Sequence, residues 1–154
     1  SSAMIFFIII GAMIFAKFLT LSGLPDVLLT YVSGLAMPRH FILGMILFIY
    51  IVLGAFLDVV AMLAITLPLF FPLLSGLGFD GVWLAVITIK LVEIAVITPP
   101  IGLNVYVVKS SVGDTVSLSN LFRGIMPFFL MDVLTLIILV IFPQISLWLP
   151  SRMF

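Results

Sequence analysis

The sequence predicts an all-α integral membrane protein, and three observations support this fold class. Of the 154 residues, 65% are hydrophobic and 8% are charged, whereas a soluble domain is about half apolar and a quarter charged. The mean hydropathy is +1.53. The apolar runs are long and lack the alternation of barrel strands, so they are expected to be helices.

Composition also excludes several functions. The formal net charge is zero, so no nucleic-acid partner is expected. With no cysteine and one histidine, the chain has no disulfide, no thiol chemistry and no histidine-cluster metal site. The chain opens SSAMIFF, with neither an initiator Met nor a basic signal-peptide start, so it is expected to be part of a longer protein.

The first two elements are predicted to be a membrane span and a short surface helix. Residues 1–22 are nearly all apolar, and about 20 such residues cross the hydrocarbon core. Ser22, Gly23 and Pro25 then interrupt the helix, and Pro is favoured in a first turn. Residues 25–36 are therefore expected to form an interfacial helix.

Residues 41–74 are predicted to form a re-entrant helical hairpin. One straight helix of this length would reach about 51 Å, whereas two crossings need about 40 residues plus a loop. The expected arms are 41–53 and 59–74, with the tip at 54–58. A tilted, kinked single helix is the alternative.

Asp58 is the most costly residue of this hairpin. A carboxylate deep in a membrane usually marks an ion or proton path. Asp is also a favoured N-cap, and capping the second arm is compatible with ion binding. Further on, Asp80 is expected to cap the next helix from a glycine-rich loop.

Residues 82–112 are predicted to form a helix broken in the sequence EIAVITPPIGLN. Pro99 and Pro100 lack an N–H group and disfavour helix before them, so the first half should end near Ile97 or Thr98. Such a break survives in a membrane only where it is buried in protein or lines a watery cavity. Broken helices of this kind are typical of ion and substrate sites in secondary transporters.

Polar residues around the break favour a small alkali cation. Thr98 and Asn104, together with freed carbonyls, are hard oxygen ligands. Thr98 has an alternative role, in which its hydroxyl bonds back to its own helix. Lys90 and Glu93 are three residues apart and are predicted to pair, either at a helix seam or in contact with substrate.

The C-terminal part is predicted to contain a polar loop and one more span. A short helix is expected to begin near Ser117 or Ser119, and the last span is expected at 125–148, with Pro127 in its first turn. Asp132 faces either a polar partner or the interface, and the sequence leaves this open.

The motifs LGAFLD and TPPIGLN resemble the C-terminal part of the large membrane subunit of tripartite ATP-independent periplasmic (TRAP) transporters. The intervening PLFFPLLSGLGFDGVW and the later RGIMPFF and LWLP carry the same resemblance, which covers essentially the whole chain. It implies an elevator-type transporter of the ion-transporter superfamily, built from two inverted repeats. This chain would hold the second repeat's hairpin and its Pro-Pro-broken helix.

The resemblance implies sodium symport of an organic anion, such as a C4-dicarboxylate or a sugar acid, with sodium as the coupling ion and no other cofactor. The protein is therefore not expected to be an enzyme. The implied sodium ligands are Gly54, Asp58, Thr98 and Pro99. The implied substrate contacts are Gly54, Asp58, Gly102 and Asn104.

The same resemblance implies the setting of the protein. The partners would be a small membrane subunit, a periplasmic substrate-binding protein and the lipid bilayer. The location would be a bacterial or archaeal inner membrane, which the chain would cross several times. Both ends of the hairpin would face the periplasm, and the loop at 109–123 the cytoplasm.

Three alternatives are weighed against symport. The first is a proton-coupled carrier that uses Asp58 or Glu93. The second is a scaffold subunit with no site of its own. The third is an intramembrane aspartyl protease with Asp58 and Asp132, but neither the YD nor the GxGD motif of such enzymes is present.

Overall fold

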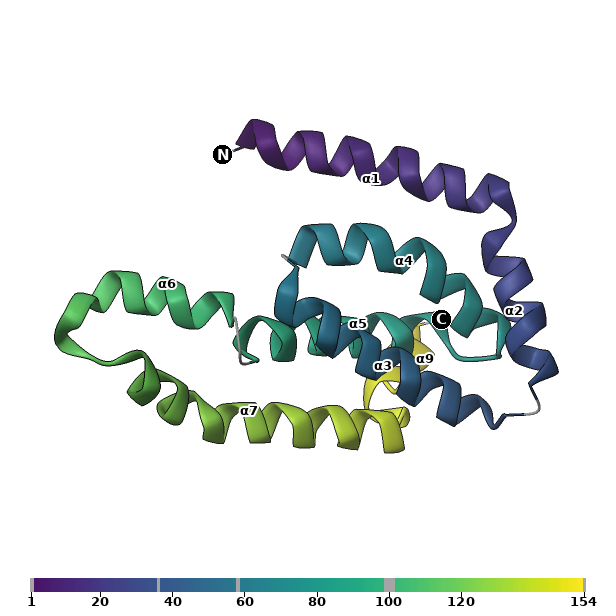
Figure 1. Ribbon diagram of the computed structural model, residues 1–154. Helices are drawn as coiled ribbons and strands as arrows, with labels where there is room; N and C mark the ends of the chain where they lie inside the picture. Colours follow the sequence, from purple (N-terminus) through teal and green to yellow (C-terminus); the bar gives the residue numbers. More distant parts are fainter. Residues whose placement is uncertain (1, 36, 58, 99–101, 154) are drawn as a thin grey trace.

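The computed structural model describes residues 2–35, 37–57, 59–98 and 102–153, and Figure 1 shows their arrangement. Within these ranges the secondary structure is helical, without a β-strand, which confirms the predicted all-α class. Three of the described helices are long and apolar enough to cross a membrane, namely α3 (Arg39–Phe56), α4 (Val59–Gly76) and α7 (Leu118–Ile141). The pair α1 and α2 adds a fourth candidate span, bent by 56°.

Helices α1 (Ser2–Ser22) and α2 (Leu24–Gly34) wrap around α4. Gly23 separates them and adopts a left-handed conformation with φ 68°, which a residue without Cβ tolerates best. Pro25 lies in the first turn of α2, as expected. In Figure 1, α1 runs along α4, and α2 turns down across the end of α4.

Helices α3 and α4 run in opposite directions, joined by a short break (Figure 1). Each has 18 residues, or about 27 Å at 1.5 Å per residue. Both helices are longer than the predicted arms, so their length is compatible with two crossings as well as with a re-entrant hairpin. The predicted tip was also too wide, because α3 continues through Gly54 to Phe56. Asp58 lies outside the described residues.

Helix α5 (Gly81–Ile97) is the centre of the bundle and packs between α3 and α7. The carboxylate of Asp80 accepts hydrogen bonds from the backbone N–H groups of Val82 (2.8 Å) and Trp83 (3.1 Å), which confirms the predicted cap. The helix ends at Ile97, as the following prolines predict. The core around it consists of buried residues of α3, α4, α5 and α7: Ile42, Leu43, Ile46, Tyr50, Met62, Leu73, Leu74, Trp83, Leu84, Ile87, Leu91, Ile94 and Leu136.

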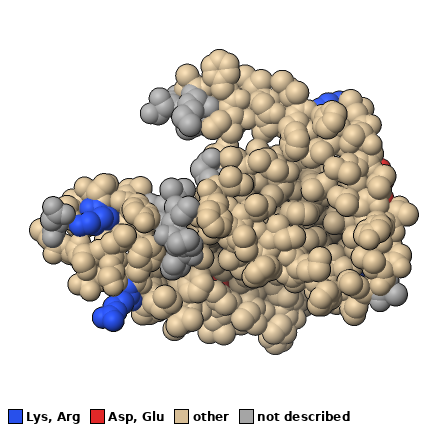
Figure 2. All heavy atoms as spheres, viewed as in Figure 1, with Lys and Arg blue, Asp and Glu red and all other residues tan. Residues whose placement is uncertain are grey.

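The chain continues through α6 (Leu103–Val112) and the 3-10 turn η1 (Gly113–Thr115) before α7 returns along α5. Together, α6 and the start of α7 project from the bundle (Figure 1). The face shown in Figure 2 is largely uncharged, and its Lys and Arg side chains gather mainly on this projection. The basic residues described there are Lys109 and Arg123.

The helix start predicted near Ser117 is confirmed, but this helix and the last span form one continuous helix, α7, which ends before the predicted residue 148. Ser117 caps α7 by accepting a hydrogen bond from the N–H of Asn120 (3.3 Å), and the helix then continues through Pro127. Proline removes one backbone hydrogen bond inside a helix, and here this does not end α7. The helix ends at Ile141, because Pro143 disfavours helical φ and ψ at Phe142. Two short helices follow, α8 (Gln144–Leu147) and α9 (Pro150–Met153).

Candidate functional site

The C-terminal turns of α3 and α5 meet at Gly54. Gly54 is buried, and a Cβ built on it would overlap the Cβ of Ala95 in α5. The same Cβ would lie 3.1 Å from the sulfur of Met62, in the first turns of α4. Glycine is therefore required for close packing at this point, and it brings the ends of α3 and α5 to the start of α4.

The break after α5 changes the backbone hydrogen bonds at this meeting point. The carbonyl of residue i in a helix accepts from the N–H of residue i+4, and the fourth residues after Ala95 and Val96 are the two prolines. The carbonyl of Ala95 instead accepts from the N–H of Thr98 at 3.2 Å. The carbonyl of Val96 likewise cannot accept from the residue four positions on, because Pro100 has no N–H group.

The Thr98 side chain makes the second of its two predicted interactions, a hydrogen bond back to its own helix. Its hydroxyl donates to the carbonyl of Ile94 at 2.6 Å, and its backbone is extended at φ −72° and ψ 128°. The hydroxyl proton is thereby used, while the oxygen lone pairs remain available. The hydrogen bond therefore leaves Thr98 able to bind a cation. Pro99 lies outside the described residues.

Gly102 starts α6 in a conformation that favours glycine. Its φ is 46° and ψ 68°, and its carbonyl accepts from the N–H of Val105 at 2.7 Å. A Cβ here would lie 3.2 Å from Val105, 3.3 Å from Phe122 of α7 and 3.4 Å from the carbonyl of Ile97. Gly102 thus brings the start of α6 back against the end of α5.

The four helix ends at this junction have complementary partial charges. The last carbonyls of α3 and α5 carry partial negative charge, and the first N–H groups of α4 and α6 carry partial positive charge. Asn104, in the first turn of α6, is exposed, and no described residue makes a hydrogen bond to its side chain. The structure thus brings Gly54, Thr98 and Gly102 to helix ends of this junction.

A charged cluster joins α5 to α7 next to this junction. The ammonium group of Lys90 donates to Glu93 at 2.7 Å, which confirms the predicted pair, and to Asp132 at 2.5 Å. The side chain of Lys90 is 18% exposed and that of Asp132 is 27% exposed. Asp132 therefore has a polar partner. The pairing was missed, although intramembrane charges usually face a partner.

A second contact fixes α5 against α7. The indole N–H of Trp83 donates to the carbonyl of Leu139 at 2.8 Å. This bond lies near the first turn of α5, whereas the ion pair from Lys90 lies further along the helix. Together they hold the two helices in one register.

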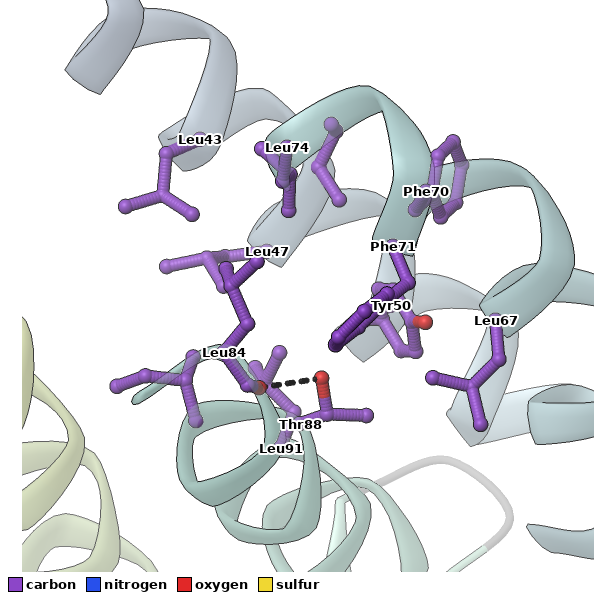
Figure 3. Close-up of a pocket in the computed structure, with 12 residues that line it drawn as sticks. Leu43, Leu47, Tyr50, Leu67, Phe70, Phe71, Leu74, Leu84, Thr88 and Leu91 are labelled. Atoms are coloured by element: carbon purple, nitrogen blue, oxygen red, sulfur yellow. Dashed lines mark hydrogen bonds between the residues drawn. The ribbon is translucent and has the colours of Figure 1, made fainter. Parts of the chain in front are cut away.

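The cavity between α3, α4 and α5 is too small to hold an organic anion. Its volume is about 10 Å³, enough for roughly one water molecule. Figure 3 shows that its walls are mostly leucine and aromatic side chains, and that the hydroxyl of Thr88 donates to the carbonyl of Leu84. None of the predicted site residues lines this cavity. Among the residues that the structure describes, no group of three or more His, Cys, Asp or Glu side chains is arranged to hold a metal ion.

Comparison with known proteins identifies the family. The family described as "Tripartite ATP-independent periplasmic transporter, DctM component" matches residues 1–145. The C4-dicarboxylate TRAP transporter large permease protein DctM of Pseudomonas aeruginosa is 33% identical over 148 residues, covering 96% of this chain and 34% of the relative. The sialic acid TRAP transporter large permease protein SiaM of Vibrio cholerae is 30% identical over 151 residues, covering 98% of this chain and 35% of the relative.

A third relative leads to the same conclusion. The C4-dicarboxylate TRAP transporter large permease protein DctM of Vibrio cholerae is 32% identical over 148 residues, covering 96% of this chain and 32% of the relative. This chain therefore spans about a third of the length of the relatives it matches. The match over residues 1–145 shows that the chain belongs to the DctM component family of tripartite ATP-independent periplasmic transporters.

Proposed function

We propose that this chain forms one half of the ion and substrate site of a sodium symporter for organic anions. The observation that carries the proposal is the junction of α3, α4 and α5 at Gly54, Met62 and Ala95, next to a helix broken by two prolines. Two of the relatives are named for C4-dicarboxylates and one for sialic acid. These are all carboxylates, which supports an organic anion as the substrate.

Sodium would bind on the side of the junction where the C-terminal ends of α3 and α5 present their carbonyls. Gly54 is one of the last four residues of α3, whose carbonyls in general lack an amide partner within the helix. The Val96 carbonyl and the Thr98 hydroxyl oxygen add further ligands from α5. Hard oxygen atoms of this kind suit an alkali cation. Asp58 and Pro99 complete the proposed sodium site.

The carboxylate of the substrate would bind on the side formed by the N-terminal ends of α4 and α6. The positive end of each helix dipole favours an anion there. Gly102 lets the start of α6 pack closely against the end of α5, and the exposed amide of Asn104 is a donor in the first turn of α6. Gly54 and Asp58 would complete this side of the pocket from the hairpin.

Re-entrance of α3 and α4 is part of the proposal. The end of α3 at Gly54 packs against the end of α5 at Ala95. This contact is an argument for placing the α3–α4 break and the α5–α6 break inside the membrane together. Sodium would stabilise the junction and so favour the arrangement that binds substrate. Its difference in affinity for the two arrangements limits this coupling. The transport domain would then move as an elevator against a scaffold.

The proposed setting is the inner membrane of a bacterium or archaeon. The remaining permease would supply the other repeat, and a small membrane subunit and a periplasmic binding protein would complete the transporter. Helices α1 and α7 expose large apolar side chains, such as Phe7 (77% exposed) and Phe128 (69% exposed). These surfaces suit lipid or other membrane helices.

The test is uptake of a C4-dicarboxylate or sialic acid into proteoliposomes that contain the complete permease, its small subunit and its binding protein. An inward sodium gradient should drive uptake. Thr98→Ala should raise the sodium concentration for half-maximal uptake about tenfold, and Thr98→Ser should restore it. Thr88→Ala is the matched control, because Thr88 lies on the same helix and makes the same type of hydrogen bond, to Leu84.

Two results would contradict the proposal. If Thr88→Ala changed sodium dependence as much as Thr98→Ala, the effect would belong to α5 as a whole and not to the break. If a pH gradient drove uptake without sodium, the permease would be a proton-coupled carrier. Asp58 and Glu93 would then be the residues to replace next.

A further inference from the structure

A groove between α4 and α5 has one charged residue among its lining. Its volume is about 250 Å³, and the lining residues are Leu63, Leu67, Ala85, Thr88, Ile89, Val92 and Glu93. The hydroxyl of Thr88 is bonded within its own helix. Ile89 is 63% exposed. The groove is thus an open, apolar surface with a carboxylate at one end.

The charge of Glu93 is only partly compensated. One of its oxygens accepts a hydrogen bond from Lys90, whose ammonium group also donates a hydrogen bond to Asp132. The cluster therefore contains one cation and two carboxylates. Among the described residues, no second basic side chain forms an ion pair with it. The side chain of Glu93 is 55% exposed, so it is accessible to a group outside this chain.

A lipid environment does not suit this carboxylate. Ionised groups within a membrane face a protein interior or a watery cavity and pair with one another. Apart from Thr88, the other residues that line the groove are apolar, and the groove lies between the two helices α4 and α5. A neighbouring helix with a basic side chain would both fill the groove and neutralise the excess charge.

We propose that this groove seats a helix of the same permease polypeptide, from the part outside this chain, and that this helix presents a Lys or Arg to Glu93. The relatives are about three times as long as this chain, so a permease of that length has further helices available. Glu93 is then a charge that holds two parts of the permease together.

Site-specific photo-crosslinking in the complete transporter tests the occupant of the groove. A photo-reactive benzoylphenylalanine replaces Ile89, and mass spectrometry identifies the product after illumination of membranes. The expected product joins position 89 to another helix of the same permease polypeptide. The control is the same substitution at Phe128, on the exposed face of α7, which should not give that product. A product with lipid alone, or with the small subunit, would overturn the proposal.

Charge reversal tests the partner of Glu93. Glu93→Lys should lower the yield of monodisperse permease several-fold, because two cations would then face each other. Reversal of the crosslinked helix's Lys or Arg to Glu should restore that yield in the double variant. A crosslinked helix without a basic residue, or a double variant as poor as Glu93→Lys alone, would overturn the proposal. Neither readout uses sodium or substrate, so both remain informative if the proposed symport fails.

Discussion

Gly54 of α3 packs directly against Ala95 of α5, with no room for a side chain between the two helices. This contact places the end of one arm of the α3–α4 pair beside the broken end of α5. Both helix breaks are then within one small region, although they lie far apart in the sequence. Helix ends brought together in this way can offer carbonyls to a cation and amides to an anion.

The first prediction concerns this contact. Gly54→Ala should destabilise the purified permease by about 1–3 kcal/mol, because overpacking forces the helices apart. Gly44→Ala, in the same helix, has nothing within 4 Å of the added Cβ. It should be neutral, or stabilising by about 1 kcal/mol through helix propensity. Thermal unfolding in detergent measures both, and equal shifts for the two variants would refute the close contact.

The second prediction concerns the charged cluster. Lys90→Met leaves Glu93 and Asp132 without their shared cation and should cost about 1–3 kcal/mol, because Lys90 and Asp132 are only partly buried. Asp132→Asn leaves the Lys90–Glu93 pair and should cost less. The unfolding midpoints of the two variants give the order. An Asp132→Asn variant less stable than Lys90→Met would contradict the shared role of Lys90.

The third prediction concerns Gly102, which combines a positive φ with close neighbours. Gly102→Ala should lose about 1–2 kcal/mol from the left-handed backbone alone, and more from the crowding by Phe122 and Val105. Gly23→Ala shares the positive φ, but its Cβ would meet open space. It should therefore be the milder variant in the same unfolding measurement. Equal losses would show that Gly102 acts through its backbone conformation only.

The fourth prediction concerns the cap of α5. Asp80→Ala removes the acceptor for two N–H groups and should cost about 1 kcal/mol. Asp80→Asn keeps a side-chain oxygen and should retain most of the stability. The comparison of unfolding midpoints separates the cap from a general effect of charge. A loss in Asp80→Asn as large as that in Asp80→Ala would assign the effect to the carboxylate charge.

Some sequence predictions failed because one residue type serves two purposes. Gly54 was expected at a helix break, where glycine is common, but it lies inside α3 and allows close packing. Pro127 was expected at the start of a helix, but α7 already begins at Leu118 and continues through it. Local sequence does not distinguish these roles, because the neighbouring helices decide whether a glycine or proline is tolerated within a helix.

The sequence by itself determined the all-α membrane class, the end of α5 at Ile97 and the cap at Asp80. Each depends on local chemistry: apolar runs, prolines without N–H groups, and a carboxylate two or three residues before free amides. Only the tertiary structure decided that Lys90 pairs with Asp132, 42 residues away, and that Gly54 meets Ala95. These contacts depend on how the helices pack around α5. That packing is set by the shapes of many side chains at once, so no short stretch of the sequence encodes it.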